Sequence, residues 1–295
     1  MAKIPQKIIL GTAQFGMEYG ISRPQGMLSD HSLSEILLFA HQANIKFIDT
    51  APAYGNAQTR IGKICSDLGL SFHFISKIPK CSPKQVIPII QKTLDDLKIQ
   101  KLDATLIHDY PHFQNNRPLW DQLSKAREKN LTTRVGFSLY HPEELQAVIK
   151  EIQDCNIVQI PFNIWDQRFA PLLKKADELK IAVHARSIFL QGAFFLNPDQ
   201  LPDFLLPTKT HLLFLNEFCK NHKISISHLA LSFALSQPML EGVVLGVHSA
   251  SQLQQNCSAQ LPPSLLSLFQ NQATRLPPLD TNVLIPKYWK NVPPL

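Results

Sequence analysis

The 295-residue chain lacks the features that would place it in several large classes of protein. Its net charge is +6, yet Lys and Arg are scattered and form no run of five or six, so no nucleic-acid-binding patch is indicated. The apolar run near the N-terminus is too short for a secretory signal or a membrane span. We therefore expect a cytoplasmic protein with no nucleic-acid, membrane or obligatory protein partner.

Cysteine is sparse and shows no pattern. The chain has 5 cysteines, an odd number; no two are spaced as CxxC, and none lies in a Cys/His cluster. Free thiols in a reducing compartment are the plain interpretation, and we expect neither a disulfide framework nor a metal site.

The glycine-rich phosphate-binding loops are also missing. No GxGxxG follows the first expected strand, and GxxxxGK[ST] does not occur. A doubly wound open sheet is the structural alternative for an alternating α/β chain, and this alternative lacks its usual fingerprint here.

What the chain does have is an α/β rhythm with a large apolar fraction. Hydrophobic residues make up 44% and charged residues 18%, so a sizeable core can be buried. We expect strands at 7–11, 46–49, 72–77, 104–108, 134–138, 157–160, 182–187 and 242–245. Amphipathic helices are expected at 33–43, 57–68, 83–97, 119–129, 142–153, 171–179, 211–221 and 227–235, with a last one from 251. Eight such units with strands too apolar to have a wet face favour an α/β fold of the (β/α)8 TIM-barrel type.

We expect the barrel to be a single domain covering 1–295, followed by a tail from about residue 260 that is rich in Pro and Leu. Two interpretations of this tail remain open. It could wrap over the barrel surface, or it could form a loop that walls the substrate pocket.

Polar side chains stand at the ends of three successive expected strands. Asp49 ends the second strand and Tyr54 follows in the next loop, Lys77 ends the third strand, and His108 ends the fourth. Active residues of barrels lie at these carboxyl ends. Alone, each residue could be a cap, a solvated end or a satisfied core histidine; together they favour a site.

Carbonyl reduction explains this set of residue types. Negative charge develops on the carbonyl oxygen, and Tyr54 would deliver the proton to it. Lys77 is expected to lower the tyrosine pKa from its reference value of about 10. Asp49 would pair with Lys77, and His108 would donate to the carbonyl oxygen and orient it.

These residues resemble the catalytic tetrad of the aldo-keto reductase family in order and spacing. GTAQFG at Gly11–Gly16 and DTAPAYG at Asp49–Gly55 are similar to that family's opening signatures, and the resemblance runs from about Ile8 to Asn256. It implies a small carbonyl substrate. It also implies an NADP(H) cofactor, with NAD(H) possible, extended across the barrel mouth without a Rossmann motif.

The resemblance further implies a set of cofactor contacts. Ser138 and Gln159 would bind the nicotinamide carboxamide, Ser187 with 189–192 would follow the pyrophosphate, and 246–256 would hold the adenosine phosphate. The residues expected at the cofactor are Gly11, Thr12, Asp49, Ser138, Gln159, Arg186, Ser187, Phe189, Leu190, Gly192, His248, Ser249, Gln252, Gln255 and Asn256.

Three positions depart from the family pattern. Leu139 replaces the usual Asn, Arg186 stands where an aromatic ring often stacks on the nicotinamide, and Gln252 replaces a common basic residue. Since 246–256 contains no Lys or Arg, we expect only a modest preference for NADPH over NADH.

Aromatic residues on the expected rim loops suggest an apolar pocket mouth. Phe15, Tyr110 and Trp165 are the residues expected to line it.

Two other functions compete with the reductase. A barrel that binds the cofactor could act as a sensor or interaction subunit without significant turnover, because fold does not dictate function. An aldolase-type barrel could use Lys77 in a Schiff base, but such a lysine needs a desolvated site without a neighbouring acid.

Overall fold

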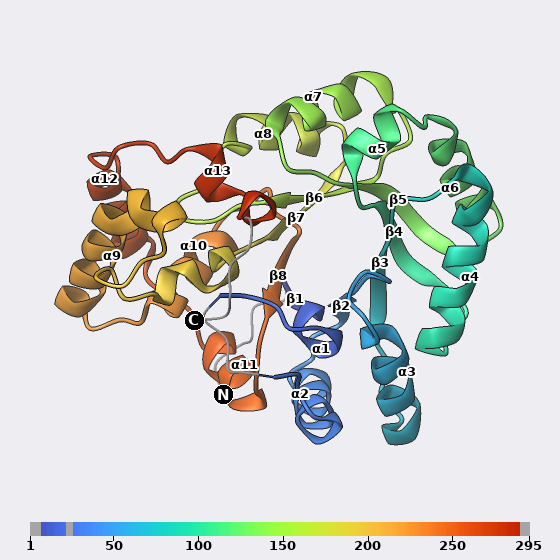
Figure 1. Cartoon of the computed structure of the whole chain (residues 1–295), viewed down its shortest axis with the longest axis horizontal. Helices are drawn as coiled ribbons and strands as arrows, with labels where there is room; N and C mark the ends of the chain where they lie inside the picture. The colour runs from blue at the N-terminus through green and yellow to red at the C-terminus, as the bar shows by residue number, and fades with distance from the viewer. Residues whose placement is uncertain (1–6, 22–25, 290–295) are drawn as a thin grey trace.

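Eight parallel strands close into a barrel, in which each strand pairs with the next and β8 pairs with β1 (Figure 1). The computed structural model describes residues 7–21 and 26–289. The strands are β1 (Ile8–Gly11), β2 (Phe47–Asp49), β3 (His73–Ile78), β4 (Leu102–Ile107), β5 (Thr132–Ser138), β6 (Ile157–Pro161), β7 (Ala182–Arg186) and β8 (Gly242–Gly246). The expected (β/α)8 barrel is confirmed. The ends of the chain, including the start of the N-terminal apolar run and the last six residues of the tail, lie outside the described residues.

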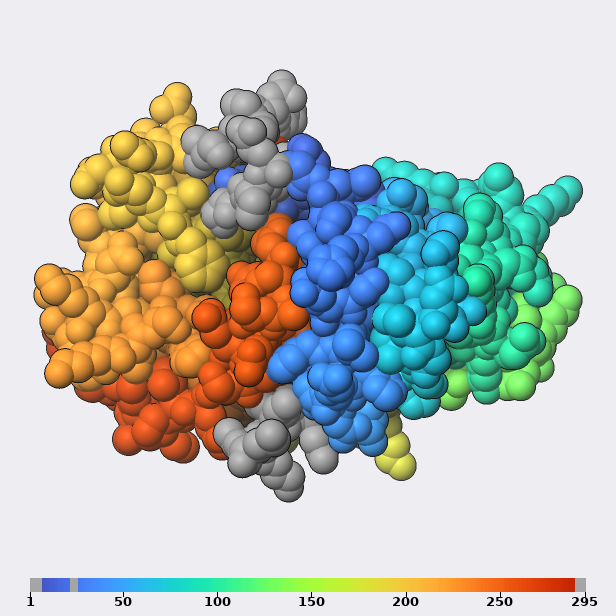
Figure 2. All heavy atoms as spheres, turned by 90° about the horizontal axis from the view of Figure 1, so that it is seen from below, coloured from blue at the N-terminus to red at the C-terminus, as the bar shows by residue number. Residues whose placement is uncertain are grey.

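Helices surround the strands on the outside of the barrel (Figure 1). Those that follow a barrel strand are α2 (Asp30–Gln42), α3 (Ala57–Leu68), α4 (Val86–Leu97), α6 (Pro118–Glu128), α7 (Pro142–Glu151), α8 (Ala170–Glu178), α9 (Lys209–His222), α10 (Ile226–Leu235) and α11 (Ala250–Cys257). The shorter elements are α1 (Ala13–Gly16), η1 (Pro83–Gln85), α5 (Tyr110–Gln114), η2 (Leu190–Phe195) and η3 (Asp203–Thr208). The ring closes where α11 packs beside α2, seen in Figure 2 as the orange and blue segments in contact.

Local sequence signals account for the helix boundaries. Ser29 caps α2 by accepting a hydrogen bond from the backbone N–H of Ser32. Gly69 ends α3 in a left-handed conformation, φ 64°. The stretch expected to be one helix from Pro83 instead begins as the 3₁₀ turn η1, and α4 proper starts at Val86.

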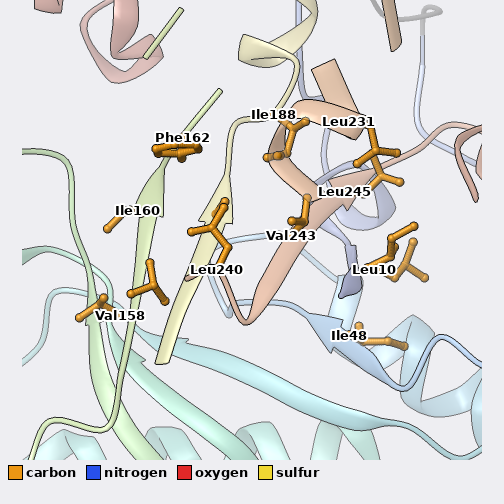
Figure 3. Packing of buried hydrophobic residues seen from close by; sticks show 14 of the residues in the cluster. Leu10, Ile48, Val158, Ile160, Phe162, Ile188, Leu231, Leu240, Val243 and Leu245 are labelled. Carbon is orange, nitrogen blue, oxygen red and sulfur yellow. The ribbon is translucent and has the colours of Figure 1, made fainter. Parts of the chain in front are cut away.

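Two apolar layers bury both faces of the strands. Ile9, Ile75, Leu106, Ala104 and Ile157 form a small cluster inside the barrel. Neighbouring strand residues such as Leu10, Ile48, Val158 and Ile160 belong instead to the larger cluster shared with the helices (Figure 3). Because successive side chains of a strand alternate between faces, the strand residues of the small cluster point into the barrel and those of the larger cluster point towards the helices.

The tail forms α12 (Pro263–Ala273), α13 (Thr281–Leu284) and η4 (Pro286–Tyr288) on the barrel surface. Trp289 packs against Phe204 with ring centroids 5.5 Å apart, and its indole N–H donates to the Val283 carbonyl at 3.1 Å. In residues 7–21 and 26–289 no helix combines the length and the apolar character needed to cross a membrane.

Candidate active site

The strand alternation brings the predicted polar residues to one mouth of the barrel. Asp49 lies two residues after Phe47, Lys77 two after Ile75, and Gln159 two after Ile157, and these earlier residues belong to or pack on the interior cluster. A spacing of two keeps the side chain on the same face. The polar residues therefore point inward at the carboxyl end, above the apolar layer.

Lys77 and Asp49 form a buried ion pair. The Lys77 Nζ donates to Asp49 Oδ1 at 2.6 Å, to the Thr50 carbonyl at 3.2 Å and to the Tyr54 hydroxyl at 3.2 Å. The lysine side chain is only 1% exposed. The second carboxylate oxygen of Asp49 accepts from Gln159 Nε2 at 2.8 Å. All three ammonium hydrogens are thus engaged, which holds the charge at a defined point beside the phenol.

Tyr54 is presented by the loop between β2 and α3. Its hydroxyl oxygen accepts from Lys77, whose Nζ also lies 5.1 Å from the ring centroid. The ring meets the imidazole of His108 edge-on, with centroids 6.3 Å apart. Among the described residues the Tyr54 O–H has no acceptor of its own, so its proton remains available to a ligand in the mouth.

The expected lowering of the Tyr54 pKa is wrong for this structure. Burial first, and then the Asp49 carboxylate, raise the pKa of Tyr54 well above 10, although the Arg186 charge opposes them. The physical reason is that Asp49 offsets the ammonium 2.6 Å away, so the phenolate would face a nearly neutral pair. Tyr54 is therefore protonated throughout the neutral range.

His108 is a neutral imidazole at physiological pH. Burial first, and then the charges of Lys77 and Arg186, lower the pKa of His108 to about 3. Its side chain makes no hydrogen bond within the described part of the chain. A neutral imidazole donates from one ring nitrogen, so His108 can orient a carbonyl oxygen as a donor without carrying charge.

The two signature segments touch through glycines. A Cβ on Gly16 would lie 2.0 Å from the Tyr54 carbonyl oxygen and 2.3 Å from the Ala57 nitrogen. Gly55 adopts φ +59°, and a Cβ there would lie 2.1 Å from the Gly16 carbonyl oxygen. Only glycines allow this approach, which sets the position of the Tyr54 loop against β1.

A cavity of about 350 Å³ opens at this mouth and runs between β1, β7 and α11. Many of the residues predicted to hold a cofactor or substrate line it: Gly11, Thr12, Asp49, Tyr54, Gln159, Arg186, Ser187, Phe189, Gly192, His248, Gln252, Gln255 and Asn256.

The other predicted polar and cofactor residues lie behind this lining or beside it. Lys77 lies behind Tyr54, and Ser138 pairs in register with Gln159 while its hydroxyl meets no partner in the described structure. Leu190 is buried in the core, and Ser249 caps α11 by accepting from the Gln252 N–H at 3.1 Å.

The three aromatic residues expected at the pocket mouth do not line the cavity. Phe15 is 0% exposed in the core. Tyr110 packs against Phe137 with centroids 5.5 Å apart. Trp165 packs edge-on against Phe194 and lines a separate cavity beneath the tail. Short loops turn these rings into the core, where their apolar area is buried, and no described tail residue lines the main cavity.

Several lining residues carried no sequence signal, because they meet only in the fold. Tyr19, Phe195 and Ser227 are the clearest cases, whereas Gln191 and Gln14 fall within the segments 189–192 and Gly11–Gly16 that the resemblance had singled out. The Ile21 N–H donates to the Gln191 carbonyl at 2.9 Å, and Gln191 Nε2 donates to the Tyr19 hydroxyl at 3.0 Å. These bonds tie the loop after β1 to the loop after β7.

The cavity suits an extended polar ligand such as a nicotinamide dinucleotide. Ser187, Leu190 and Gln191 have positive φ values of 59°, 45° and 52°, a strained arrangement typical of ligand-binding loops. The buried Ser138 Oγ and Asn256 Nδ2 have no hydrogen-bond partners among residues 7–21 and 26–289, and they belong to opposite ends of the predicted cofactor path. Buried polar atoms of this kind normally find a partner, which a bound dinucleotide would supply.

The closed (β/α)8 barrel carries a Tyr–Lys–Asp–His group at its carboxyl mouth, and comparisons with known proteins give the class of this barrel. The model of the Aldo/keto reductase family matches residues 7–264, and the chain belongs to this family. Family membership supports an oxidoreductase acting on small carbonyl compounds.

The curated relatives are distant. The chain is similar to dihydrodiol dehydrogenase 3 of Bos taurus, with 22% identity over 74% of this chain and 75% of that protein. It is also similar to D-threo-aldose 1-dehydrogenase of Pseudomonas sp., with 21% identity over 85% of this chain and 91% of that protein.

Solved structures agree on the fold. A thermostable aldo-keto reductase in complex with the inhibitor epalrestat superposes with a TM-score of 0.68 at 20% identity, covering 90% of this chain and 94% of that one. A putative aldo-keto reductase from Pseudomonas aeruginosa gives a TM-score of 0.66 at 15% identity, covering 89% and 90%.

Proposed function

We propose that this protein reduces an aldehyde or ketone to an alcohol by hydride transfer from NAD(P)H, with Tyr54 as the proton donor. The observation that supports this most directly is the Tyr54 hydroxyl, 3.2 Å from the Lys77 ammonium at the floor of a cavity. We further propose that the whole chain is one domain that works in the cytoplasm without an obligatory partner.

Each residue of the group has a distinct task. A bound nicotinamide would supply the hydride. Tyr54 donates its proton to the oxygen on which negative charge develops, and the Lys77 ammonium then stabilises the phenolate that remains. Asp49 and the Thr50 carbonyl hold Lys77 in place. His108 donates a hydrogen bond to the carbonyl oxygen and fixes its orientation.

Replacing Tyr54 tests this assignment. Tyr54→Phe removes the proton but keeps the ring, so carbonyl reduction should fall by about 10²–10⁴-fold, the usual value of general acid catalysis. NADPH affinity, measured by quenching of protein fluorescence, should change little because Tyr54 handles the proton rather than the cofactor. A variant that kept more than about a tenth of wild-type turnover would place the donor elsewhere.

The cofactor should be NADPH with only a modest preference over NADH. The described cavity lining contains one Arg and no Lys, and that Arg186 ends β7 rather than lying in 246–256. The polar groups that 246–256 places toward a 2′-phosphate are His248, Ser249, Gln252 and the N-terminal end of α11. Without a permanent cation there, we expect the ratio of the NADH and NADPH dissociation constants to be about ten, since each charge-assisted bond contributes roughly 1.5–3 kcal/mol. A measured ratio above about a thousand would require a cation from another part of the chain.

The competing functions fare differently. A Schiff base at Lys77 is disfavoured, because the amine is paired with the Asp49 carboxylate at 2.6 Å and all its hydrogens are engaged. A cofactor-binding subunit without turnover would share the fold, and steady-state reduction of any aldehyde by NADPH separates it from an enzyme.

A further inference from the structure

Arg186 is a cation in the candidate cavity, and no carboxylate in the described part of the chain forms an ion pair with it. It ends β7 and lines the cavity together with Tyr54 and Gln159. Within residues 7–21 and 26–289, no Asp or Glu lies within ion-pair distance of its guanidinium. Arg186 is half-buried and opens onto the cavity, so its charge can be offered to an anionic ligand there.

The guanidinium is held in place by neutral groups. Its Nη2 donates to the Leu139 carbonyl at 2.9 Å, its Nη1 donates to the Ser187 hydroxyl at 3.3 Å, and its Cζ lies 4.2 Å from the Tyr140 ring centroid. These contacts fix the orientation of the planar fork and leave its charge intact. Two of its five N–H donors are used, so others remain for a bound anion.

The carboxylates around Arg186 are committed elsewhere. Asp49 binds Lys77 and Gln159. Glu144 accepts from the Tyr140 and His141 backbone N–H groups. Asp166 pairs with Arg168 at 2.8 Å.

The rim next to the site carries excess positive charge. Lys287 lies 5.2 Å from the same Tyr140 ring that Arg186 covers. Lys287 and Lys80 both pair with Asp109, at 3.2 and 3.5 Å, so two cations share one carboxylate beside His108. With Lys77 and Asp49 cancelling, the mouth presents a net positive field that attracts anions.

Tyr19 adds a neutral donor on the facing loop. Its oxygen accepts from Gln191, and its own O–H has no acceptor among the described residues. The Tyr19 pKa is raised to about 12, chiefly by burial, so the phenol keeps its proton. The charge of Arg186 contributes a lowering of the pKa at four groups, as expected for a cation at the centre of the site. These groups are Tyr19, Tyr54, Lys77 and His108.

We propose that the carbonyl substrate carries a carboxylate, which the Arg186 guanidinium binds while Tyr54 serves the carbonyl. The inference rests on the proposed reductase function and names its substrate class. The same fork chemistry could serve a phosphate of the cofactor, and the experiment below separates the two sources.

A matched pair of ligands tests the charge directly. 4-Formylbenzoate and methyl 4-formylbenzoate differ in charge and by one methyl group, and the corresponding alcohols, 4-(hydroxymethyl)benzoate and its methyl ester, do not react when no NADP⁺ is present. Calorimetric titration of the alcohols into the wild-type protein should give at least about tenfold tighter binding of the carboxylate, from one or two charge-assisted hydrogen bonds. The same preference should appear in kcat/KM for the two aldehydes.

Three variants test whether Arg186 causes the preference for the carboxylate ligand. In Arg186→Met, the loss of affinity and of kcat/KM should be at least about tenfold larger for the carboxylate ligand than for the ester. Arg186→Lys keeps the charge without the planar fork and should retain part of the preference. Arg117→Met, the same substitution on an outer-face arginine whose side chain is 47% exposed, should leave the preference unchanged.

Several results would overturn the inference. Equal binding of acid and ester by the wild type would do so, and this comparison needs no variant to fold. So would an Arg186→Met protein whose affinity for NADPH falls more than its affinity for the carboxylate, because the fork would then serve the cofactor. If the protein preferred the carboxylate through Arg186 but reduced no aldehyde, the ligand class would be supported and the proposed reductase activity would be wrong.

Discussion

At the scale of single residues, the proposed active site combines a phenol and an imidazole that burial keeps uncharged. Tyr54 has a raised pKa and His108 a pKa of about 3, so both are neutral over the physiological range. Lys77 retains its position through Asp49, although burial lowers its pKa. The chemistry therefore depends on where hydrogen bonds point more than on groups that titrate near pH 7.

A pH prediction follows from these two groups. Tyr54 stays protonated below its raised pKa, and His108 stays neutral above a pKa of about 3. Neither changes its protonation between about pH 5 and 9, so kcat for reduction should show no step from Tyr54 or His108 in that range. His108→Gln, which keeps a neutral donor, should retain more activity than His108→Phe.

The measurement is the rate of NADPH oxidation with saturating aldehyde across this pH range. A step near pH 6–7 that disappears in His108→Gln would show that the imidazole is charged during turnover, contrary to its buried environment.

At the scale of elements, the short helix α1 and the start of α3 meet at two glycines and thereby position Tyr54. The absence of a side chain at Gly16 lets its backbone reach the Tyr54 carbonyl. The segments GTAQFG and DTAPAYG, which both resemble the family's opening signatures, are thus adjacent in space.

Gly16→Ala should displace the Tyr54 loop, because the new Cβ would lie 2.0 Å from a backbone oxygen that cannot move alone. We expect kcat to fall at least tenfold, with destabilisation of about 1–3 kcal/mol typical of overpacking. Turnover and urea unfolding measure the two effects.

Gly69→Ala is the matched control. Gly69 has φ +64° and no atom within 4 Å of its Cβ position, so alanine there should cost about 1–2 kcal/mol of backbone strain and leave kcat unchanged. Equal losses of kcat in both variants would mean that Gly16 contributes to stability alone.

At the scale of the whole molecule, a charged network closes the barrel end opposite the site. His184 Nε2 lies 3.1 Å from the Glu241 carboxylate, and Arg134 bridges Glu241 and Asp103 at 2.5 and 2.6 Å. The network joins β4, β5 and β7 with the residue preceding β8. The network thus holds the amino-terminal parts of these strands together and contributes to the closure of the barrel.

Acid should weaken this closure. The His184 hydrogen bond first, and then Arg134, lower the pKa of Glu241 from 4.5 to about 2 against the opposing effect of burial. A lowered carboxyl pKa stabilises the fold above the unfolded-state value, and the contribution is lost as pH falls from about 4.5 towards 2.

Glu241→Gln should therefore be less stable than wild type at pH 7 by roughly 1 kcal/mol, a value discounted because the Glu241 side chain is 51% exposed. The difference should vanish near pH 2. Urea unfolding at several pH values measures it, and Glu178→Gln, in an exposed pair with Lys175, should show almost none. If the difference in unfolding free energy between the variant and the wild type did not depend on pH, the charge of Glu241 would not be its cause.

The amino-acid sequence alone determined the rhythm of eight strands, and with it the barrel. Strands that are apolar on both faces must be covered by helices, and a spacing of two residues places Asp49, Lys77 and Gln159 on the inner face. That these polar residues gather at one rim was predictable, because the alternation along each strand and the parallel order bring strand ends together there.

Only the tertiary structure decided what the loops contribute. Tyr19 and Gln191 lie 172 positions apart and meet across the cavity, whereas Phe15, Tyr110 and Trp165 turn into the core. The direction of the Tyr54 pKa depends on burial and on the 2.6 Å distance between Lys77 and Asp49. Loop paths and desolvation arise from contacts between distant segments, and no local pattern in the chain encodes them.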